Sequence, residues 1–292
     1  MSIKTVLTEA TEEELAESVQ ENLFALFGAM ATVLPEAEIV IGQGLNYHHA
    51  FPTNPMFKGV WGTNLENGDL DAAIDHIIAW FRARNAPYFF WWTGPDTVPN
   101  DLGTQLQARG LLDMAEQQQE LAAGIRQTDL GAPGMVADLH EMNEAVLTQT
   151  PPGFTIVKVN DEQSLYDFKR VFVETYKIPD WAGQAWVDAT LALGIGETPW
   201  CMYVGYLNGQ PVATNMLFTG GGVAGLYAVA TIPAVQGQGI GAAISLKPLL
   251  DARDKGYHYG VLFSTEMGIR VYQRIGFRLT DVRLNRYLWR NV

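Results

Sequence analysis

The sequence is poor in cysteine, in positive charge and in long apolar runs. Its 292 residues include a single cysteine, Cys201, which excludes a disulfide within the chain and is typical of a cytoplasmic protein. Only 19 Lys and Arg residues stand against 32 Asp and Glu, and the formal net charge of -13 argues against a nucleic-acid partner, which needs a basic face. No apolar run is long enough to span a membrane, and the polar, acid-rich residues 1–18 are unlike a signal peptide.

Apolar residues are present in sufficient number for a substantial core, since 48% of the chain is hydrophobic and only 17% is charged. The length predicts one large or two medium domains. A stretch with scattered Gly and Pro ends in Pro151-Pro152-Gly153 and predicts the junction, which gives domains of residues 1–150 and 151–292. Helical and strand patterns in both domains predict an α+β fold with mixed sheets.

The first domain has three helical patterns and several strand-like runs. Apolar residues at helical spacing from Leu15 to Phe27 predict a helix. Further helices are expected over residues 70–85 and 99–110, and strands over 37–45, 87–93 and 111–125. The aromatic run FFWW, residues 89–92, is expected in the core of a central strand rather than in a cage for a cation. His48 and His49 would point to opposite faces of a strand, and with no third ligand no metal site is expected.

The second domain predicts a regular order of elements. We expect a strand over residues 154–159, helices over 161–176 and 180–194, a hairpin over 200–218, and a strand over 225–231. A glycine loop follows, then a helix to about residue 255, a strand over 258–265, a helix over 266–276 and a last strand over 277–289. The segment YQRIGFR from Tyr272 weakly parallels LQARGLL from Leu106, which favours two related halves.

The loop lies in the stretch AVATIPAVQGQGIGAAI, which has glycines at three alternate positions, 237, 239 and 241. A P-loop would need Lys after its last glycine, but Ala242 stands there. The spacing Gly237-x-Gly239-x-x-Ala242 satisfies a dinucleotide-binding fingerprint literally, and an acidic residue, Glu266, lies downstream. That fingerprint should follow the first strand of a doubly wound sheet, whereas only about fifty residues remain here, so dinucleotide binding is the less favoured alternative.

A third pattern in the same stretch is Gln236-x-x-Gly239-x-Gly241, placed between a strand and a helix. Consecutive backbone N–H groups and a helix N-terminus form an anion site suited to a pyrophosphate. Here the sequence resembles the GNAT superfamily of acyl-CoA N-acyltransferases, and so does the order of elements from Phe154 to the C-terminus. The resemblance implies that this loop grips the pyrophosphate of acetyl-CoA or another acyl-CoA, and that the preceding strand pairs with the pantetheine arm. The cofactor-binding residues that it implies are Val229, Ala230, Thr231, Gln236, Gly237, Gln238, Gly239, Ile240, Gly241 and Ala242.

The segment VYQRIGF, residues 271–277, resembles the family's aliphatic-Tyr-x-x-x-Gly-Phe pattern. The resemblance implies that Tyr272 is the general acid that protonates the departing thiolate, and the alternative is a tyrosine that only packs against Phe277. By position, an N–H near Val229 could polarise the acyl carbonyl.

Three departures from the family pattern stand out. Thr265 occupies a position where many relatives have Asn, Pro248 falls inside the expected helix after the loop, and the strand GLYAVAT carries no acidic residue. Glu266, or more weakly His258, could replace the missing acid, although both fit a surface or packing role. The amine could also lose its proton to solvent, so no dedicated base is required.

The first domain has no comparable loop, and Leu106 stands opposite Tyr272 in the repeat. We therefore expect a degenerate GNAT-like domain before a complete one. The leading hypothesis is an enzyme, a cytoplasmic N-acetyltransferase that moves an acyl group directly to a small-molecule amine, without an acyl intermediate on Cys201. The competing hypothesis is a non-catalytic acyl-CoA-binding module of the same fold. Neither a membrane nor a nucleic acid is expected as a partner, and no pattern specifies an oligomeric state.

Overall fold

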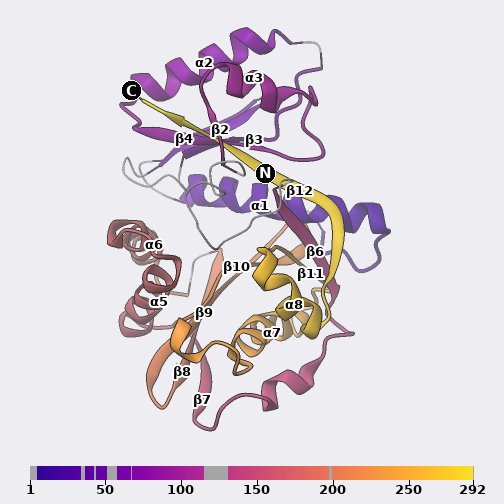
Figure 1. Ribbon diagram of the computed structural model, residues 1–292, viewed down its shortest axis with the longest axis vertical. Helices are drawn as coiled ribbons and strands as arrows, with labels where there is room; N and C mark the ends of the chain where they lie inside the picture. The colour runs from indigo at the N-terminus through magenta and orange to yellow at the C-terminus, as the bar shows by residue number, and fades with distance from the viewer. Residues whose placement is uncertain are drawn as a thin grey trace. The chain divides into compact units, whose positions relative to one another are not determined.

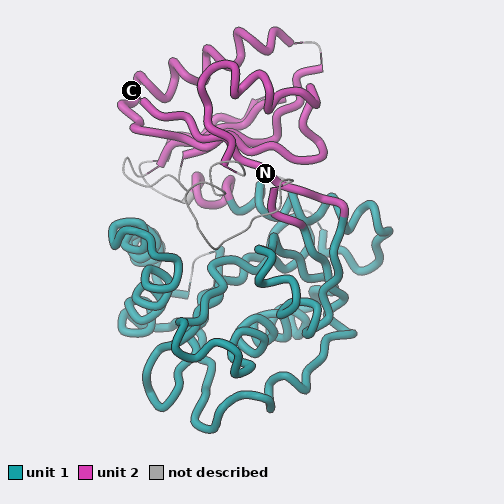
Figure 2. The backbone as a smooth tube through the Cα atoms, viewed as in Figure 1, with its two compact units in different colours: residues 1–26, 134–280 teal, residues 27–133, 281–292 magenta. Residues whose placement is uncertain are grey.

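The computed structural model describes residues 5–33, 37–42, 44–50, 58–66, 68–114, 131–196 and 199–291. Contacts between Cα atoms divide the chain into two compact units. Unit 1 contains residues 1–26 and 134–280, and unit 2 contains residues 27–133 and 281–292 (Figure 2). Helix α1 (Glu12–Val33) begins in unit 1 and ends in unit 2.

In unit 1 the strands follow the order β6-β11-β10-β9-β8-β7 in a mixed sheet (Figure 1). Neighbouring strands are antiparallel except β10 and β11, which are parallel. The strands are β6 (Ala132–Asp138), β7 (Phe154–Lys158), β8 (Trp200–Leu207), β9 (Gln210–Gly220), β10 (Val223–Thr231) and β11 (Tyr259–Phe263). The helices are η2 (Glu144–Thr148), α5 (Glu162–Tyr176), α6 (Asp180–Leu193), η3 (Pro233–Val235), α7 (Ile240–Arg253) and α8 (Glu266–Ile275).

Local sequence signals explain several of these elements. Asn208 and Gly209 have φ values of 51° and 78°, which form the hairpin turn between β8 and β9 that the Asn-Gly pair predicts. Asp161 caps α5: its side chain accepts from the N–H of Ser164 at 2.7 Å, completing a capping box. The expected order of elements from residue 154 onward is confirmed, and the expected last strand over residues 277–289 is β12 (Arg278–Arg290).

Helix α7 continues through Pro248 instead of stopping before it. Because proline has no N–H, the carbonyl of Ile244, four residues earlier, loses its usual helical donor. The buried side chain of Asn215 on β9 replaces that donor, and its Nδ2 donates to the Ile244 oxygen at 3.0 Å. A side chain from the sheet thus satisfies the backbone group that the proline leaves open.

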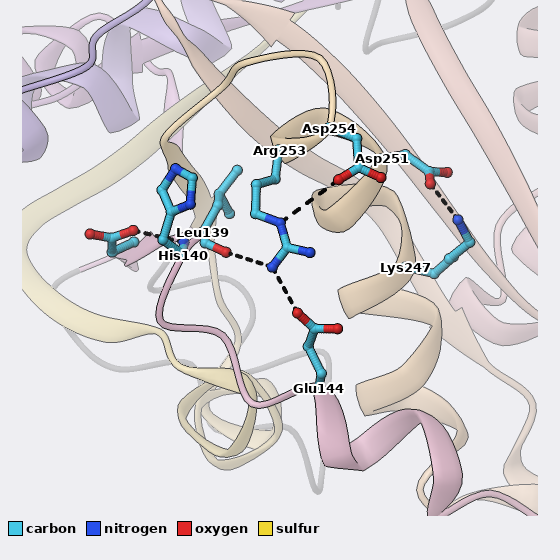
Figure 3. Close-up of polar contacts among 8 residues, drawn as sticks. Leu139, His140, Glu144, Lys247, Asp251, Arg253 and Asp254 are labelled. Atoms are coloured by element: carbon cyan, nitrogen blue, oxygen red, sulfur yellow. Dashed lines mark hydrogen bonds and ion pairs between the residues drawn. The ribbon is translucent and has the colours of Figure 1, made fainter.

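The C-terminal end of α7 is tied to the segment that follows β6 (Figure 3). The Arg253 guanidinium donates to Glu144 at 2.7 Å and to the Leu139 carbonyl at 3.4 Å. On the same helix Lys247 pairs with Asp251, whose carboxylate also accepts from the Tyr203 hydroxyl at 2.9 Å. These contacts fix the helix whose other end carries the glycine loop.

The core of unit 1 has two layers. One face of the sheet packs against α7 through residues such as Leu217, Leu226 and Leu249. The other face packs against the first part of α1, where Leu15 and Val19 contact strand residues of β6, β10 and β11. Residues of β10 therefore alternate between an α7 side and an α1 side, as the pleat of a strand requires.

Unit 2 has strands in the order β1-β2-β3-β4-β12, with β5 pairing on β12. Only β3 and β4 are parallel. The elements are β1 (Glu38–Ile41), β2 (Asn46–His49), β3 (Lys58–Trp61), α2 (Leu70–Ala83), β4 (Tyr88–Thr93), α3 (Leu102–Ala108), β5 (Leu112–Asp113) and β12 (Arg278–Arg290). The expected strand over residues 111–125 is described only as far as residue 114, where it forms β5, and its residues 115–125 lie outside the described residues.

The aromatic run of β4 lies in the core of unit 2, as expected. Phe89 and Trp91 are fully buried and pack with Phe81 of α2 and Leu106 of α3. Phe90 and Trp92 point to the other face, where the Arg286 guanidinium lies 5.2 and 5.6 Å from their ring centroids. One face of the run therefore builds a core, and the other contacts a cation of the protein itself.

His48 and His49 occupy opposite faces of β2. The His48 ring packs 5.0 Å from the Trp61 ring, whereas the His49 ring lies 6.4 Å from those of Trp80 and Phe81. Within the described ranges no group of three His, Cys, Asp or Glu side chains is placed to hold a metal ion.

The two units do not follow the expected junction at residue 150. Strand β6, which precedes that junction, was not predicted, and it pairs with β11 inside unit 1. Strand β12 comes from the end of the chain and pairs with β4 inside unit 2. Each half of the sequence thus supplies a strand to the unit built mainly by the other half. Gly and Pro residues in and next to β6 interrupt the strand pattern in the sequence, although Met135, Val136 and Ala137 are buried as in a central strand.

Candidate cofactor and acyl-transfer site

Strand β10 is interrupted by a bulge at Ala228 and Val229, hereafter the β10 bulge. Its pairing with β9 shifts register between Tyr227 and Ala230, and Ala228 has a φ of 49°, a left-handed value that alanine rarely adopts. Two hydroxyls hold the bulge. Thr214 Oγ1 donates to the Ala228 carbonyl at 2.9 Å, and the Tyr176 hydroxyl donates to the Val229 carbonyl at 2.9 Å.

The other edge of β10 is paired with β11 only near its beginning. The parallel ladder contains Ala224 with Gly260 and Gly225 with Val261, and it ends before the bulge. Beyond it, Ala230 and Thr231 still pair with β9. The β11 side of residues 229–231 is therefore outside the ladder, at the place where the sequence predicts pairing with the pantetheine arm.

The glycine loop, residues 236–242, follows β10 directly. The Gln236 side chain turns back and donates from Nε2 to the Thr231 carbonyl at 2.9 Å. Gly237 and Gly239 have φ values of 76° and 83°. A Cβ at position 239 would lie 2.2 Å from the Gln149 oxygen, so this position requires glycine for both its backbone angle and its close contact.

Helix α7 starts at the loop with its N–H groups directed outward. The Ala243 N–H bonds to the Gly239 carbonyl at 3.1 Å, whereas the N–H groups of residues 240–242 have no partner within their own helix. Ile240 and Ala242 bury their side chains in the core, so only their backbones can serve a ligand. This arrangement of N–H groups is suited to a phosphate.

Gly241 differs from Gly239 in its surroundings. A Cβ at position 241 would meet Thr231 Oγ1 at 3.6 Å and Val271 Cγ1 at 3.8 Å, which are ordinary contact distances. The protein therefore leaves room for a methyl group there. The same distances place the loop next to α8, the helix that carries Tyr272.

Tyr272 lies on α8, which begins at the carboxyl end of β11. Because β10 and β11 are parallel, the glycine loop and α8 both follow the strands at the same end of the sheet, the carboxyl end of β10 and β11. A Cβ at Gly268 would lie 2.8 Å from Tyr272 Cε2, so glycine there lets the ring pack close to its own helix. The Tyr272 ring also contacts Phe277 edge to face at 6.0 Å.

Burial raises the pKa of the Tyr272 hydroxyl, and the nearby Tyr176 hydroxyl raises it further. Burial also raises the pKa of Tyr176, to about 12. Both phenols are therefore protonated at neutral pH and can donate. The Tyr176 hydroxyl donates its proton to the Val229 carbonyl of the β10 bulge.

The structure also places the two candidate bases. His258 lies just before the amino-terminal end of β11, whereas the glycine loop lies at the carboxyl end of the neighbouring strand β10. The His258 ring centroid is 4.8 Å from that of His140. Glu266 is the exposed first residue of α8, directly after Thr265. Thr265 itself caps that helix by accepting from the Gly268 N–H at 3.3 Å, which gives it a local structural role.

Asn22 was missed by the sequence analysis, because it lies in an amphipathic helix with no motif around it. It is fully buried, and its Nδ2 donates to the Gly220 carbonyl at 2.7 Å. Its Oδ1 accepts from the Tyr227 hydroxyl on β10 at 2.6 Å. Instead of an acidic residue, β10 thus presents a tyrosine that is fixed by α1.

With this geometry established, comparison with known proteins shows what the chain is similar to. A family model described as Acetyltransferase (GNAT) family matches residues 165–277, so this segment is similar to the acetyltransferase domains of that family. The match includes β10, the glycine loop, α7 and Tyr272. No curated protein matches the sequence.

Solved structures extend the likeness to nearly the whole chain at the level of the fold. The GCN5-related N-acetyltransferase from Kribbella flavida has a TM-score of 0.66 and 14% identity, over 94% of each chain. A tandem GNAT protein from the clavulanic acid biosynthesis pathway has a TM-score of 0.59 and 12% identity, covering 99% of this chain and 97% of its own. The GCN5-related N-acetyltransferase from Sphaerobacter thermophilus has a TM-score of 0.59 and 13% identity, covering 98% and 97%. The expected α+β fold of tandem GNAT type is confirmed.

None of the helices in the described part of the chain combines the length and the apolar character needed to cross a bilayer.

Proposed function

We propose that the protein is an N-acetyltransferase that moves an acetyl or other acyl group from coenzyme A to a small-molecule amine in the cytoplasm. One observation carries this proposal. The open edge of β10, the glycine loop and the helix of Tyr272 meet at the carboxyl ends of two parallel strands that have stopped pairing. Acyl transfer needs an anion site, a backbone edge and a proton donor at such a place.

The residues present fit coenzyme A. The N–H groups of residues 240–242 and the left-handed glycines 237 and 239 provide a cradle for the pyrophosphate. Residues 229–231 offer backbone groups on the side facing away from β9. Acyl-CoA supplies an activated thioester, and the protein has to orient it and stabilise charge on the acyl oxygen.

Tyr272 is the proposed general acid for the departing thiolate. Its raised pKa keeps the proton on the phenol until a strong base develops next to it. An incoming amine can lose its proton to solvent, because β10 carries no carboxylate that would accept it. Direct transfer in a ternary complex is favoured because Cys201 lies on β8, which β9 separates from β10.

A non-catalytic acyl-CoA-binding module of the same fold is the second candidate. The observation that favours it is the replacement of an acid on β10 by Tyr227, whose hydroxyl bonds to Asn22. Dinucleotide binding is less favoured, because β10 pairs antiparallel with β9 instead of standing in a doubly wound parallel sheet.

The experiment is a screen of acetyl-CoA consumption over pools of small amines, with Tyr272→Phe as the test variant. The substitution keeps the ring against Phe277 and removes only the proton donor. We expect turnover to fall about a hundredfold or more, with coenzyme A affinity within a few-fold of the parent. Tyr166→Phe, a change at an exposed tyrosine of α5, is the matched control and should keep full turnover.

Each other outcome has a distinct meaning. Loss of thermal stability in Tyr272→Phe with unchanged turnover supports a packing role for the tyrosine. A parent protein that binds acetyl-CoA and acylates none of the amines supports the binding module.

A further inference from the structure

The β10 bulge has two consecutive carbonyls that are each held by a side-chain hydroxyl from a different element. Thr214, fully buried on β9, holds the Ala228 oxygen, and Tyr176, the last residue of α5, holds the Val229 oxygen. Register pairing with β9 is absent at both residues, so these hydroxyls replace ladder hydrogen bonds.

Holding a carbonyl also fixes the N–H group of the next residue. The peptide bond is planar and trans, so the Ala228 C=O and the Val229 N–H lie in one plane and point in opposite directions. Thr214 draws the Ala228 oxygen to the β9 side. The Val229 N–H therefore points to the β11 side, where the parallel ladder has already ended at Gly225 and Val261.

The backbone at this place would not keep that orientation unaided. Ala228 has a left-handed φ of 49°, which costs energy for a residue with a Cβ and persists only where its surroundings impose it. Thr214 and Tyr176 are the described side chains that bond to the two carbonyls of the bulge. Thr214 thus fixes the peptide plane that contains the Val229 N–H, and Tyr176 fixes the next peptide plane, so Val229 is held from both sides.

We propose that Thr214 and Tyr176 are positioning residues, which hold the β10 bulge so that the Val229 N–H donates to the acyl oxygen of the bound thioester. This inference rests on the proposed acyl transfer and deepens it. Thr214 contributes more than Tyr176, because it is fully buried and it holds the carbonyl whose peptide plane contains the Val229 N–H.

The first test compares Thr214→Val, Thr214→Ser and Thr190→Val. Valine keeps the shape of threonine and removes its hydroxyl, and we expect kcat to fall at least tenfold with little change in KM for acetyl-CoA, because misplacement by about 1 Å costs about a hundredfold. Serine keeps the hydroxyl and should restore most of kcat. Tyr176→Phe should lower kcat by a smaller factor.

Thr190→Val is the matched control for stability. Thr190 is also buried, and it accepts a hydrogen bond from Trp200 Nε1 at 3.2 Å, away from β10. The Thr190→Val variant should lose about as much free energy of unfolding as Thr214→Val does, while its kcat stays unchanged. The inference is overturned if Thr214→Val keeps kcat within twofold of the parent, or if Thr190→Val loses as much kcat.

A second test does not need turnover. Acetyl-CoA is compared with ethyl-CoA, a thioether that lacks the carbonyl, by calorimetry. The parent should bind acetyl-CoA about fivefold more tightly, which is the net value of one hydrogen bond. In Thr214→Val the ratio of the affinity for acetyl-CoA to that for ethyl-CoA should approach one. In Thr190→Val this ratio should stay at the parental value.

The two tests separate the proposals. The proposed transfer and this inference are both overturned if the parent binds neither acetyl-CoA nor ethyl-CoA. They are also both overturned if the parent binds the two ligands equally and acylates no amine. A parent that acylates an amine and prefers acetyl-CoA, with the same preference and the same kcat in Thr214→Val, overturns only the positioning role.

Discussion

At the scale of single residues, the candidate site is formed mainly by backbone groups, and the side chains determine where those groups point. Gly239 is required by the fold, because its φ is 83° and a Cβ would lie 2.2 Å from a carbonyl oxygen. Gly241 is not required in this way, because a Cβ there would make only ordinary contacts. We therefore propose that glycine at position 241 keeps space for the bound cofactor.

This difference predicts opposite results at two neighbouring glycines. Gly239→Ala should lower the free energy of unfolding by about 1–3 kcal/mol, because it combines an unfavourable φ with a backbone clash. Gly241→Asp should stay folded and lose coenzyme A binding, because its carboxylate adds bulk and negative charge beside the pyrophosphate. Thermal melts and calorimetry measure both effects.

Unchanged coenzyme A affinity in folded Gly241→Asp would contradict the placement of the pyrophosphate. Gly241→Ala is the control for added bulk alone. NADH is titrated into the same proteins, and its binding to the parent would favour the dinucleotide alternative.

The glycine pattern and Tyr272 could be predicted from sequence because their spacing is local. The bulge could not, because alanine at position 228 gives no signal of a left-handed φ, and the hydroxyls that hold it come from β9 and α5. Asn22 was missed for the same reason, since its partners lie about 200 residues away in the chain.

At the scale of elements, α7 illustrates how a sheet can compensate for a defect in a helix. Pro248 predicts a bend or a break from sequence alone, yet the helix runs through it from Ile240 to Arg253. The donor that replaces its missing N–H is the side chain of Asn215, and no local pattern reveals that pairing. The helix that presents the glycine loop therefore depends on a buried contact with β9.

We expect this pairing to appear as coupling between Asn215 and Pro248. Asn215→Ala should lower the free energy of unfolding by about 1–3 kcal/mol, because it leaves the buried Ile244 carbonyl without a donor. In a Pro248→Ala background the restored backbone N–H supplies that donor, so the same substitution should cost clearly less. Urea unfolding of the four proteins completes the cycle, and equal costs in both backgrounds would refute the account.

In unit 2, β2 carries a buried histidine that should make stability depend on pH. His48 is 1% exposed, and neither ring nitrogen has a hydrogen-bond partner. Burial lowers its pKa to about 3, and the nearby His49 and Lys58 add to the effect. Below the unfolded pKa of 6.5 the unfolded chain binds a proton that the native state does not. Stability is therefore lost as pH falls from about 6.5 toward 3.

Between pH 6.5 and pH 5, this residue should remove about 2 kcal/mol from the free energy of unfolding. Phenylalanine at this position cannot titrate and suits the aromatic surroundings. As the pH falls from 6.5 to 5, the urea midpoint of the parent should therefore fall more than the urea midpoint of His48→Phe. Parallel pH profiles of the two proteins would show that His48 does not titrate on unfolding.

At the scale of the whole molecule, the chain is built as two units that exchange strands. Strand β6 comes before the expected junction and completes the sheet of unit 1, while β12 comes from the chain end and pairs within unit 2. Sequence patterns predict the order of elements along the chain. They do not predict which sheet a strand joins, because that depends on contacts between distant segments.

Both units place parallel strands next to each other, β3 with β4 and β10 with β11, and each pair is linked by a helix. Only unit 1 has a glycine loop between strand and helix. The corresponding segment of unit 2, residues 62–69, has glycines at positions 62 and 68 and lacks the spacing of 237, 239 and 241. In the sequence repeat, Leu106 on α3 aligns with Tyr272 on α8. We therefore propose that unit 2 is a degenerate GNAT-like part without a cofactor site.

This asymmetry predicts one coenzyme A per chain. Calorimetric titration of the parent should give a stoichiometry of one, because among the described residues the loop of unit 1 combines a helix N-terminus with glycines at positions 237, 239 and 241, a spacing that residues 62–69 lack. Gly241→Asp, which alters unit 1 alone, should remove all of the binding heat. A stoichiometry of two in the parent, of which one site survives in folded Gly241→Asp, would mean that unit 2 binds the cofactor without the loop.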